Sequence, residues 1–360
     1  MRKERDKTSG GERPPIREDT ESCFCLLPPN METVDKGEFY FPKLNISCKM
    51  TRRPHLDTLV IDTVLSAVIV LTVVLNMLVI IAISHFRQLH TTTNLLLLSL
   101  AVADFFVGLL LMPLLLLVEN HGCIFLCDLM CTVQWFSGFL FISVSVGSMV
   151  LISVDRYVAI CDPMLYTTRV TLARVKLCVC LCWIFSGIHG GWILRDSLFQ
   201  PNLYDPCVGD CVVVIASAEG AVDLIVSFLA PILIIAILYL RVFAVAVSQA
   251  RAMRSHIASV TVGRPEKVKV EKSELKAART LGIVVMVFLL CSCPYYCFAI
   301  AAESNLVGSS SAGVELWFLY LNSSFNPVIY VFFYPWFRKA IKHIITLQIL
   351  KPGSREISVL

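Results

Sequence analysis

Residues 322–337 read NSSFNPVIYVFFYPWF, a stretch in which asparagine and serine precede a proline and then a run of large apolar and aromatic side chains. This stretch closes the last and most polar of seven apolar runs, which begin near Leu59, Asn94, Thr132, Lys176, Val212, Ala278 and Val314. Each run has about 20 residues or more, the length that a helix needs to cross a hydrocarbon core about 30 Å thick. The sequence GIHGGW, residues 187–192, interrupts the fourth run.

The composition excludes a water-soluble protein. Of the 360 residues, 56% are hydrophobic and only 16% are charged, which is too few charges to coat a soluble body of this size. We therefore predict an all-α membrane protein, a bundle of seven transmembrane helices. A short amphipathic helix, YPWFRKAIKHIITL, should follow it and lie on the inner leaflet with its basic residues toward lipid head groups.

Basic residues in the loops predict the orientation. The linkers after the odd-numbered runs carry Arg87, Arg169, Arg174, Lys176, Arg251, Arg254, Lys267, Lys269 and Lys272. The loop ESNLVGSSSAG has no basic residue. Because cytoplasmic loops concentrate Lys and Arg, we place the amino terminus outside the cell and the protein in the plasma membrane. The predicted parts are an extracellular tail over 1–56, a seven-span domain over 57–335, and an amphipathic helix with cytoplasmic tail over 336–360.

The amino-terminal tail has two distinct parts. Residues 1–30 are polar, rich in Lys and Arg, and contain no signal-peptide apolar core. A positive segment is awkward to translocate, and Met31 opens a more ordinary tail, so we expect 1–30 to be an upstream extension that the working protein lacks. The motif NIS at Asn45 is a glycosylation acceptor, whereas NSS at Asn322 lies inside a span and should stay bare.

Six cysteines fall on the predicted outer side, where disulfides form and persist. They are Cys48, Cys123, Cys127, Cys131, Cys207 and Cys211. The sequence alone does not fix their pairing.

Two acidic side chains, Asp104 and Asp223, lie deep in the spans. An unpaired carboxylate at the centre of a bilayer costs roughly 3 kcal/mol, so each needs a partner. The sequence places no His or Lys with them, which argues against an intramembrane hydrolase. No lysine lies between Lys276 and Lys339 to bind retinal, and the chain lacks the internal repeats of a transporter.

Several polar residues should face one another halfway through the bundle. They are Asn76, Asp104, Ser145, Asn322, Ser323 and Asn326. Each alone is explained equally well as a satisfied buried polar group. A converging set with one carboxylate favours a site for a hydrated cation. We expect a structural sodium ion there, and no other cofactor or metal.

Short motifs in a fixed order resemble those of the rhodopsin-like G-protein-coupled receptors. They are DRY at Asp155, Arg156 and Tyr157, then Trp183, Pro231, Pro294, and NPVIY from Asn326 to Tyr330. The resemblance covers roughly Leu59 to Ile345. Within that class, NSSFNPVIYVFFYPWFRKA, AARTLGIVV and CVGDC are similar to the trace amine-associated receptors.

The resemblance implies an olfactory or amine-sensing receptor rather than an enzyme. Its partners would be a small amine, membrane lipid and a stimulatory heterotrimeric G protein that raises cAMP, with no nucleic acid. Similar receptors pair their outer cysteines, which implies bonds of Cys131 with Cys211 and of Cys48 with Cys207. The residues implied in activation and G-protein coupling are Asp155, Arg156, Tyr157, Tyr239, Glu274 and Tyr330. Asp155 would hold Arg156 at rest, and Glu274 can reach the same guanidinium.

The chain departs from the family where the amine should bind. Amine receptors carry an aspartate eighteen residues before the arginine of DRY, and that position is Gly138 here. Asp223 points into the same cavity from the fifth span, as in a subset of fish trace-amine receptors, with Ser227 one turn further on. Glu219, one turn nearer the outside, would add a second contact for a diamine. The alternative is that Asp223 bonds to a neighbouring Tyr or Ser and only shapes the helix.

Aromatic side chains at the family's pocket positions would surround the ammonium. They are Tyr295, Tyr296, Trp317 and Tyr320. The tryptophan common two residues before the sixth-span proline is Ser292, so activation would pass through Tyr295 or Phe288 instead. Two alternatives stay open: a receptor of this fold for a neutral or peptide ligand, and a cation- or proton-conducting protein that uses Asp104 and Asp223.

Overall fold

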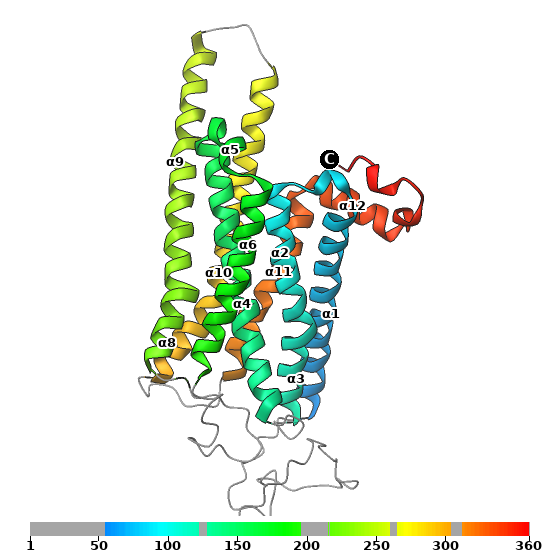
Figure 1. Ribbon diagram of the computed structural model, residues 1–360, viewed down its shortest axis with the longest axis vertical. Coiled ribbons are helices and arrows are strands. Elements are labelled where there is room, and N and C mark those ends of the chain that lie inside the picture. Colours follow the sequence, from blue (N-terminus) through cyan, green and yellow to red (C-terminus); the bar gives the residue numbers. More distant parts are fainter. Residues whose placement is uncertain are drawn as a thin grey trace, which may run out of the picture.

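The computed structural model describes the backbone at residues 55–121, 128–195, 215, 217–259, 265–303 and 312–359, and side chains at 59–117, 132–195, 215, 217–245, 247–248, 282–301 and 314–359. Seven helices long and apolar enough to cross a membrane run side by side in a bundle (Figure 1). These spans are Leu59–His85, Thr92–Leu117, Thr132–Cys161, Leu172–Ile193, Ser217–Val245, Gly282–Ala301 and Val314–Phe333. The predicted seven-span bundle is confirmed, and each span begins within a few residues of its predicted start.

Nine α-helices in the described part of the chain build the seven spans. They are α1 (His55–His85), α2 (Thr92–Phe106), α3 (Met112–His121), α4 (Asp128–Cys161), α6 (Leu172–Ile193), α8 (Ser217–Asp223), α9 (Ala230–Ser259), α10 (Pro265–Glu303) and α11 (Ala312–Phe333). Short elements at the inner end are η1 (Arg87–Leu89), α5 (Pro163–Arg169), η6 (Gln348–Leu350) and η7 (Ser354–Glu356).

Threonine residues fix the inner starts of two spans. The side chain of Thr91 accepts a hydrogen bond from the Asn94 amide at 3.3 Å, and Thr171 accepts one from the Arg174 amide at 3.4 Å. Both threonines are extended in backbone conformation, as N-cap residues are. These caps define where α2 and α6 leave the inner loops.

The fourth span is not interrupted by GIHGGW. Helix α6 continues through these residues to Ile193, because the glycines serve close packing rather than a turn. A Cβ added at Gly190 would lie 3.2 Å from the Cβ of Phe139 on α4. The expectation of a break was therefore wrong at this point, and the small residues bring α6 against α4.

Two spans contain a π-helical turn that the sequence did not reveal. Segment η2 (Val107–Leu111) joins α2 to α3, and η4 (Leu224–Leu229) joins α8 to α9. A π-turn inserts one residue into the helix and changes the direction of side chains on its two sides. In the fifth span the turn begins directly after Asp223.

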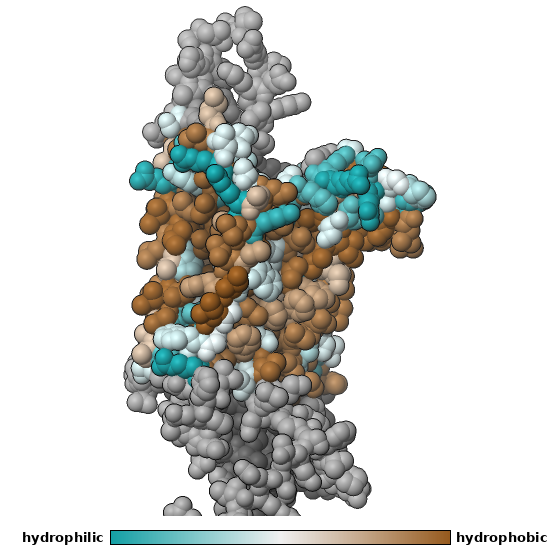
Figure 2. Space-filling view, in the orientation of Figure 1, coloured by the Kyte–Doolittle hydropathy of each residue, from teal (hydrophilic) through white to brown (hydrophobic). Residues whose placement is uncertain are grey.

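The largest apolar core lies in the inner half of the bundle. Its fully buried members include Phe86, Leu97, Leu100, Phe288 and Phe337. The surface around the sides of the bundle is also apolar, with exposed side chains such as Leu59 and Leu290. Figure 2 shows this surface as a broad hydrophobic band below the hydrophilic inner end. This is the inverse of a soluble protein, in which such faces would be covered.

Helix α12 (Pro335–Ile345) extends sideways from the inner end of the bundle (Figure 1). Trp336, Phe337, Ala340 and Ile344 are buried on one face, whereas Arg338 and Lys339 are exposed on the other. The predicted amphipathic helix is confirmed, and it begins at Pro335. The chain after it folds back toward α1, where the Ser354 hydroxyl lies 3.0 Å from His85 Nε2.

Candidate ligand site and coupling end

A cavity with about 380 Å³ of empty space, part of it open to solvent, lies in the outer half of the bundle, between α4, the fifth span, α10 and α11. Its polar lining residues are Ser143, Asp223, Ser227, Tyr295, Tyr296 and Tyr320, and its apolar lining includes Trp135, Phe139 and Leu319. The predicted positions Gly138, Asp223, Ser227, Tyr295, Tyr296 and Tyr320 are therefore brought together. Trp317 is buried in the neighbouring apolar cluster with Leu111 and Met112.

Asp223 is the acidic residue of this cavity. Only 7% of the residue is exposed, and its Oδ1 accepts a hydrogen bond of 2.8 Å from the Ser227 hydroxyl. The Tyr296 side chain lines the same cavity. The Ser227 bond is one that Asp223 would also make if it only shaped the helix. A carboxylate offers about four lone-pair positions, so this one donor leaves room for a ligand.

Aromatic rings form the wall beside Asp223. Tyr296 stacks on Phe228 with ring centroids 4.5 Å apart, and Tyr295 meets Tyr296 edge to face at 5.0 Å. Rings held in these geometries are rigid and present electron-rich faces to a cation. The cavity can therefore hold a small charged group next to an apolar body.

Glu219 is not among the residues that line this cavity. Its side chain is buried against the region after α6, where its Oε1 accepts a 2.6 Å bond from Arg195 Nη2. The guanidinium of Arg195 also lies over the Trp192 ring, 5.5 Å from its centroid. The predicted second amine contact is thus already paired with a cation.

His189 lies beside Asp223, a contact that the sequence analysis did not anticipate. Its Nε2 lies 3.8 Å from Asp223 Oδ1, so the expectation that no histidine accompanies the span acids was wrong. The reason is that α6 and α8 are adjacent, which brings together residues that lie 34 positions apart in the sequence. The only local signal was a histidine within the apolar run of GIHGGW.

A polar cluster around Asp104 lies at mid-depth, as predicted. The carboxylate is fully buried and accepts bonds from Ser145 at 3.0 Å, Ser323 at 2.9 Å and Asn326 at 2.7 Å. Asn76 joins the cluster through a 3.0 Å bond from its amide nitrogen to the Ser323 carbonyl.

Three buried amide oxygens of the predicted sodium set have no hydrogen-bond donor. They are the Oδ1 atoms of Asn76, Asn322 and Asn326. Buried acceptors normally have a partner, and oxygen atoms are the ligands that hard cations prefer. These atoms therefore fit an oxygen-coordinated cation. No cluster of three or more His, Cys, Asp or Glu suited to another metal occurs in the described parts of the chain.

The inner end of the bundle holds the DRY arginine. Arg156 donates from Nε to Asp155 Oδ2 at 3.1 Å and from Nη2 to the Thr93 hydroxyl. Asp155 also accepts a 2.9 Å bond from Tyr166 of α5. The resting contact between Asp155 and Arg156 that the resemblance implies is present.

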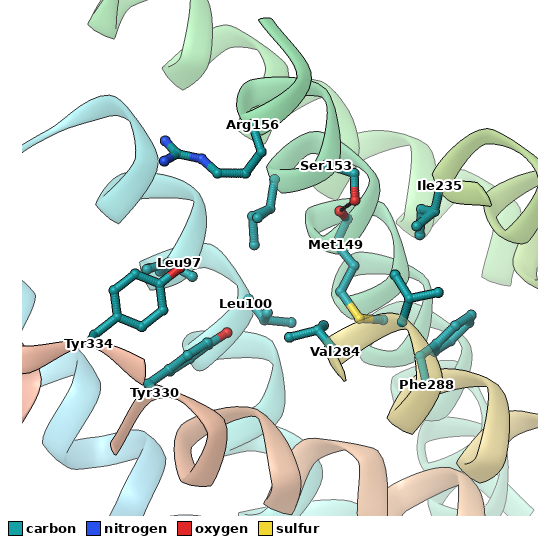
Figure 3. Close-up of a pocket in the computed structure, with 12 residues that line it drawn as sticks. Leu97, Leu100, Met149, Ser153, Arg156, Ile235, Val284, Phe288, Tyr330 and Tyr334 are labelled. Atoms are coloured by element: carbon teal, nitrogen blue, oxygen red, sulfur yellow. Dashed lines mark hydrogen bonds between the residues drawn. The ribbon is translucent and has the colours of Figure 1, made fainter. Parts of the chain in front are cut away.

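Arg156 lines a second cavity, which has about 510 Å³ of empty space, part of it open to solvent. Figure 3 shows Tyr330 and Tyr334 on one side of it and Phe288 of α10 on the other. Burial raises the pKa of the Tyr334 hydroxyl, so this group stays neutral beside the guanidinium.

Tyr239 and Tyr157 do not line this cavity. The Tyr239 hydroxyl would lie only 2.8 Å from a Cβ added at Gly282 of α10, and Tyr157 packs near Ile160 and Val242. Several predicted features lie outside the described residues: the side chain of Glu274, the glycosylation site Asn45, and the disulfide pairs of Cys131 with Cys211 and of Cys48 with Cys207.

Comparison with known proteins agrees with this geometry. Residues 75–330 match the family described as 7 transmembrane receptor (rhodopsin family). The chain is 33% identical to trace amine-associated receptor 13c of Danio rerio over 338 residues, which cover 90% of this chain and 97% of that protein. It is 36% identical to trace amine-associated receptor 7d of Rattus norvegicus over 344 residues, 93% and 95% of the two chains. It is 33% identical to trace amine-associated receptor 1 of Macaca mulatta over 320 residues, 86% and 95%.

The fold and these matches define a G-protein-coupled receptor of the rhodopsin class, a multi-pass protein of the plasma membrane. Within that class, the chain belongs to the trace amine-associated receptor family, whose members sense amines. It is therefore a receptor rather than an enzyme, with an amine ligand and G-protein partners. Membership in this family also disfavours the cation-conducting alternative.

Proposed function

We propose that this receptor recognises small primary amines through Asp223 and signals through a stimulatory G protein to cAMP. The observation that carries the proposal is the Asp223 carboxylate, which lines a cavity walled by Tyr295, Tyr296 and Tyr320. An ammonium needs a counter-charge in a buried site, and this carboxylate is the acid among the described lining residues.

The position of the acid sets how the amine lies. Because Gly138 provides no carboxylate on α4, the ammonium would approach the fifth span and extend its apolar part toward α4 and α11. Ser227 donates to Asp223 and keeps lone pairs free, so it can accept a second N–H from a primary amine. Tyr295, Tyr296, Tyr320 and, behind them, Trp317 would enclose the ligand. Glu219 would serve a diamine only where the second ammonium displaces Arg195.

The output end would work through the inner residues. Arg156 would leave Asp155 when the sixth span moves outward, and together with Tyr330 and Tyr239 it would line the cleft that admits the G protein. Tyr157 and Glu274 would contact the same cleft. A G protein inside the cell can reach this cleft only when the amino terminus lies outside. On that outer side, Asn45 would be glycosylated, and Cys131 would bond to Cys211 and Cys48 to Cys207.

Asp104, Ser145, Asn322, Ser323 and Asn326 would hold a sodium ion between the two ends. The carboxylate would supply the charge, and the unpaired amide oxygens would supply ligands. Bound sodium would stabilise the arrangement of α2, α4 and α11 that the ligand-free receptor adopts.

A second candidate function is recognition of a neutral ligand. It is favoured by the hydrogen bond that Asp223 already accepts from Ser227. The two functions differ in what they predict for Asp223→Asn, which removes the charge and keeps the side-chain volume.

The test is a cAMP dose–response in transfected cells with 2-phenylethylamine, 1,5-diaminopentane and the neutral 2-phenylethanol. If Asp223 anchors an ammonium, Asp223→Asn should lower amine potency by roughly thirty-fold to several thousand-fold, as expected for loss of a buried charge partner worth about 2 to 5 kcal/mol. Unchanged amine potency at matched surface expression would leave the neutral-ligand function as the better explanation.

A further inference from the structure

Two acids of the fifth span face two basic side chains of the fourth. Glu219 and Asp223 lie one turn apart on α8, and both are buried. Across from them, Arg195 Nη2 lies 2.6 Å from Glu219 Oε1, and His189 Nε2 lies 3.8 Å from Asp223 Oδ1. The outer pair is a closed, charge-assisted hydrogen bond. The inner pair stands at ion-pair distance and has no hydrogen bond.

His189 is available to form a closer pair. The residue is 6% exposed, and neither ring nitrogen has a hydrogen-bond partner. Its ring stacks on Phe185 with an interplanar angle of 12°, which holds the imidazole plane. A buried imidazole with both nitrogens unsatisfied is unusual, because such groups normally find a partner. Its ion-pair contact is with the carboxylate of Asp223, which we assign to the amine.

We propose that His189 is a specificity-determining residue of this site. When it is neutral, Asp223 keeps its full negative charge and selects an ammonium. When it is protonated, the imidazolium forms an ion pair with the Asp223 carboxylate. The site then has no net charge and selects a neutral hydrogen-bonding ligand. This inference rests on the proposed role of Asp223.

Other ionisable groups around the pair do not change charge near neutral pH at their ordinary pKa values. Tyr295 and Tyr296 of α10 and Tyr320 of α11 are phenols, with ordinary pKa values of about 10. Glu219 of α8 is paired with Arg195, whose guanidinium stays protonated. Segment η4 contains no ionisable side chain, and those of the described part of α4 lie at its inner end. Histidine, with an ordinary pKa of about 6.5, is the group suited to switch here.

The test compares the response to 2-phenylethylamine and 2-phenylethanol at external pH 7.5 and 5.5. This amine remains protonated at both values, so its own charge does not change. Wild-type potency for the amine should fall several-fold at pH 5.5, up to the limit of about tenfold that one competing proton with the ordinary histidine pKa of about 6.5 would give. His189→Gln should reduce the fall to less than about threefold, and His189→Lys should lower amine potency at both pH values. The ratio of 2-phenylethanol potency to amine potency should be higher at pH 5.5 than at pH 7.5 in the wild type, and it should not change with pH in the two His189 variants. His121→Gln, at the outer end of α3, is the matched control and should keep the wild-type profile.

A second measurement needs no agonist. The unfolding temperature of the purified, ligand-free wild type should rise relative to His189→Gln as the pH falls from 7.5 to 5.5, because the stabilising ion pair exists only when His189 is protonated. Asp223→Asn should abolish this difference. An equal difference between wild type and His189→Gln at both pH values, or an unaltered pH profile of potency in His189→Gln, overturns the inference.

The outcomes separate this inference from the function on which it rests. If Asp223→Asn abolishes the amine response while His189→Gln keeps the wild-type pH profile, the amine anchor stands and the role of His189 fails. If Asp223→Asn leaves the amine response intact, the proposed function fails. The specificity role fails with it, even where the thermal measurement shows the pair.

Discussion

The hydroxyl of Tyr320 lies 3.8 Å from the point at which a side chain at Gly138 would begin. This is an ordinary van der Waals distance, so α4 has room for a side chain at the position where amine receptors carry their aspartate. The missing acid is therefore a matter of residue identity and not of space. Because Tyr320 can donate a hydrogen bond there, a carboxylate introduced at 138 would have a partner ready.

Gly138→Asp should restore an amine anchor in a receptor that has lost its own. In the Asp223→Asn background, the added carboxylate should raise 2-phenylethylamine potency by at least about tenfold, which corresponds to about 1.4 kcal/mol. The dose–response in cAMP measures this. Gly138→Ala in the same background is the control and should have no effect, since it adds volume without charge. If the receptor with both Gly138→Asp and Asp223→Asn reaches the surface normally but gains no amine potency over Asp223→Asn alone, the geometry of the cavity is contradicted.

Arg195→Gln should favour diamines. Removing the guanidinium leaves the buried Glu219 without its 2.6 Å partner, and a buried unpaired carboxylate attracts a second ammonium. Potency for 1,5-diaminopentane should rise at least about tenfold relative to 2-phenylethylamine. Arg195→Lys keeps the charge and should change the ratio little. Equal changes for the two amines would show that Glu219 is out of the ligand's reach.

Gly282→Val should raise basal cAMP. A Cβ at this position meets the end of the Tyr239 side chain, 2.8 Å from its hydroxyl oxygen and 3.0 and 3.1 Å from two ring carbons, so the added valine presses Tyr239 of α9 away from α10. Overpacking of this kind costs about 1 to 3 kcal/mol, and outward movement of α10 relieves it. Gly282→Ala should produce a smaller rise. Gly187→Ala, whose added Cβ has its nearest neighbour at 4.0 Å, is the matched control. Wild-type basal cAMP in both Gly282 variants would refute the link.

Sodium should stabilise the ligand-free receptor through Asp104. At sodium concentrations tenfold above Kd, a site present only in the folded state adds about 1.4 kcal/mol of stability. The unfolding temperature should therefore be higher in NaCl than in N-methylglucamine chloride of the same ionic strength. Asp104→Asn should remove the difference. The same rise in that variant would place the sodium effect elsewhere.

The seven spans were predictable because the membrane imposes a simple rule on composition. A run such as Leu59–His85 must be apolar along its whole length to face lipid, and that pattern is visible in one dimension. The polar cluster at Asp104 was predictable for the same reason, since polar residues in such runs must turn inward and meet. The amphipathic face of α12 follows from helical periodicity.

Contacts between side chains of different spans were harder to predict from the sequence. Helical periodicity places Glu219 and Asp223 on one face, but it does not say whether that face meets the cavity or α6. In the structure Asp223 lines the cavity and also lies 3.8 Å from His189 of α6. Glu219 does not line the cavity and bonds to Arg195, which follows α6. The glycines at 190 and 191 were misread as an interruption, because close helix packing and a chain break use the same residue. The π-turns leave no mark in composition, since one inserted residue keeps the run apolar.

The π-turn at Leu224–Leu229 divides the fifth span into two helices, α8 and α9. The number of residues in the turn fixes how the side chains of α8 are rotated about the helix axis relative to those of α9. Deleting one residue from it would turn α8 by about 100° relative to α9, since each residue of an α-helix advances by that angle. Asp223 would then point elsewhere, while Tyr239 and the inner half would keep their places. A single-codon deletion or insertion here is therefore a short evolutionary route by which a receptor gene could change the chemical it detects and keep the signal it sends.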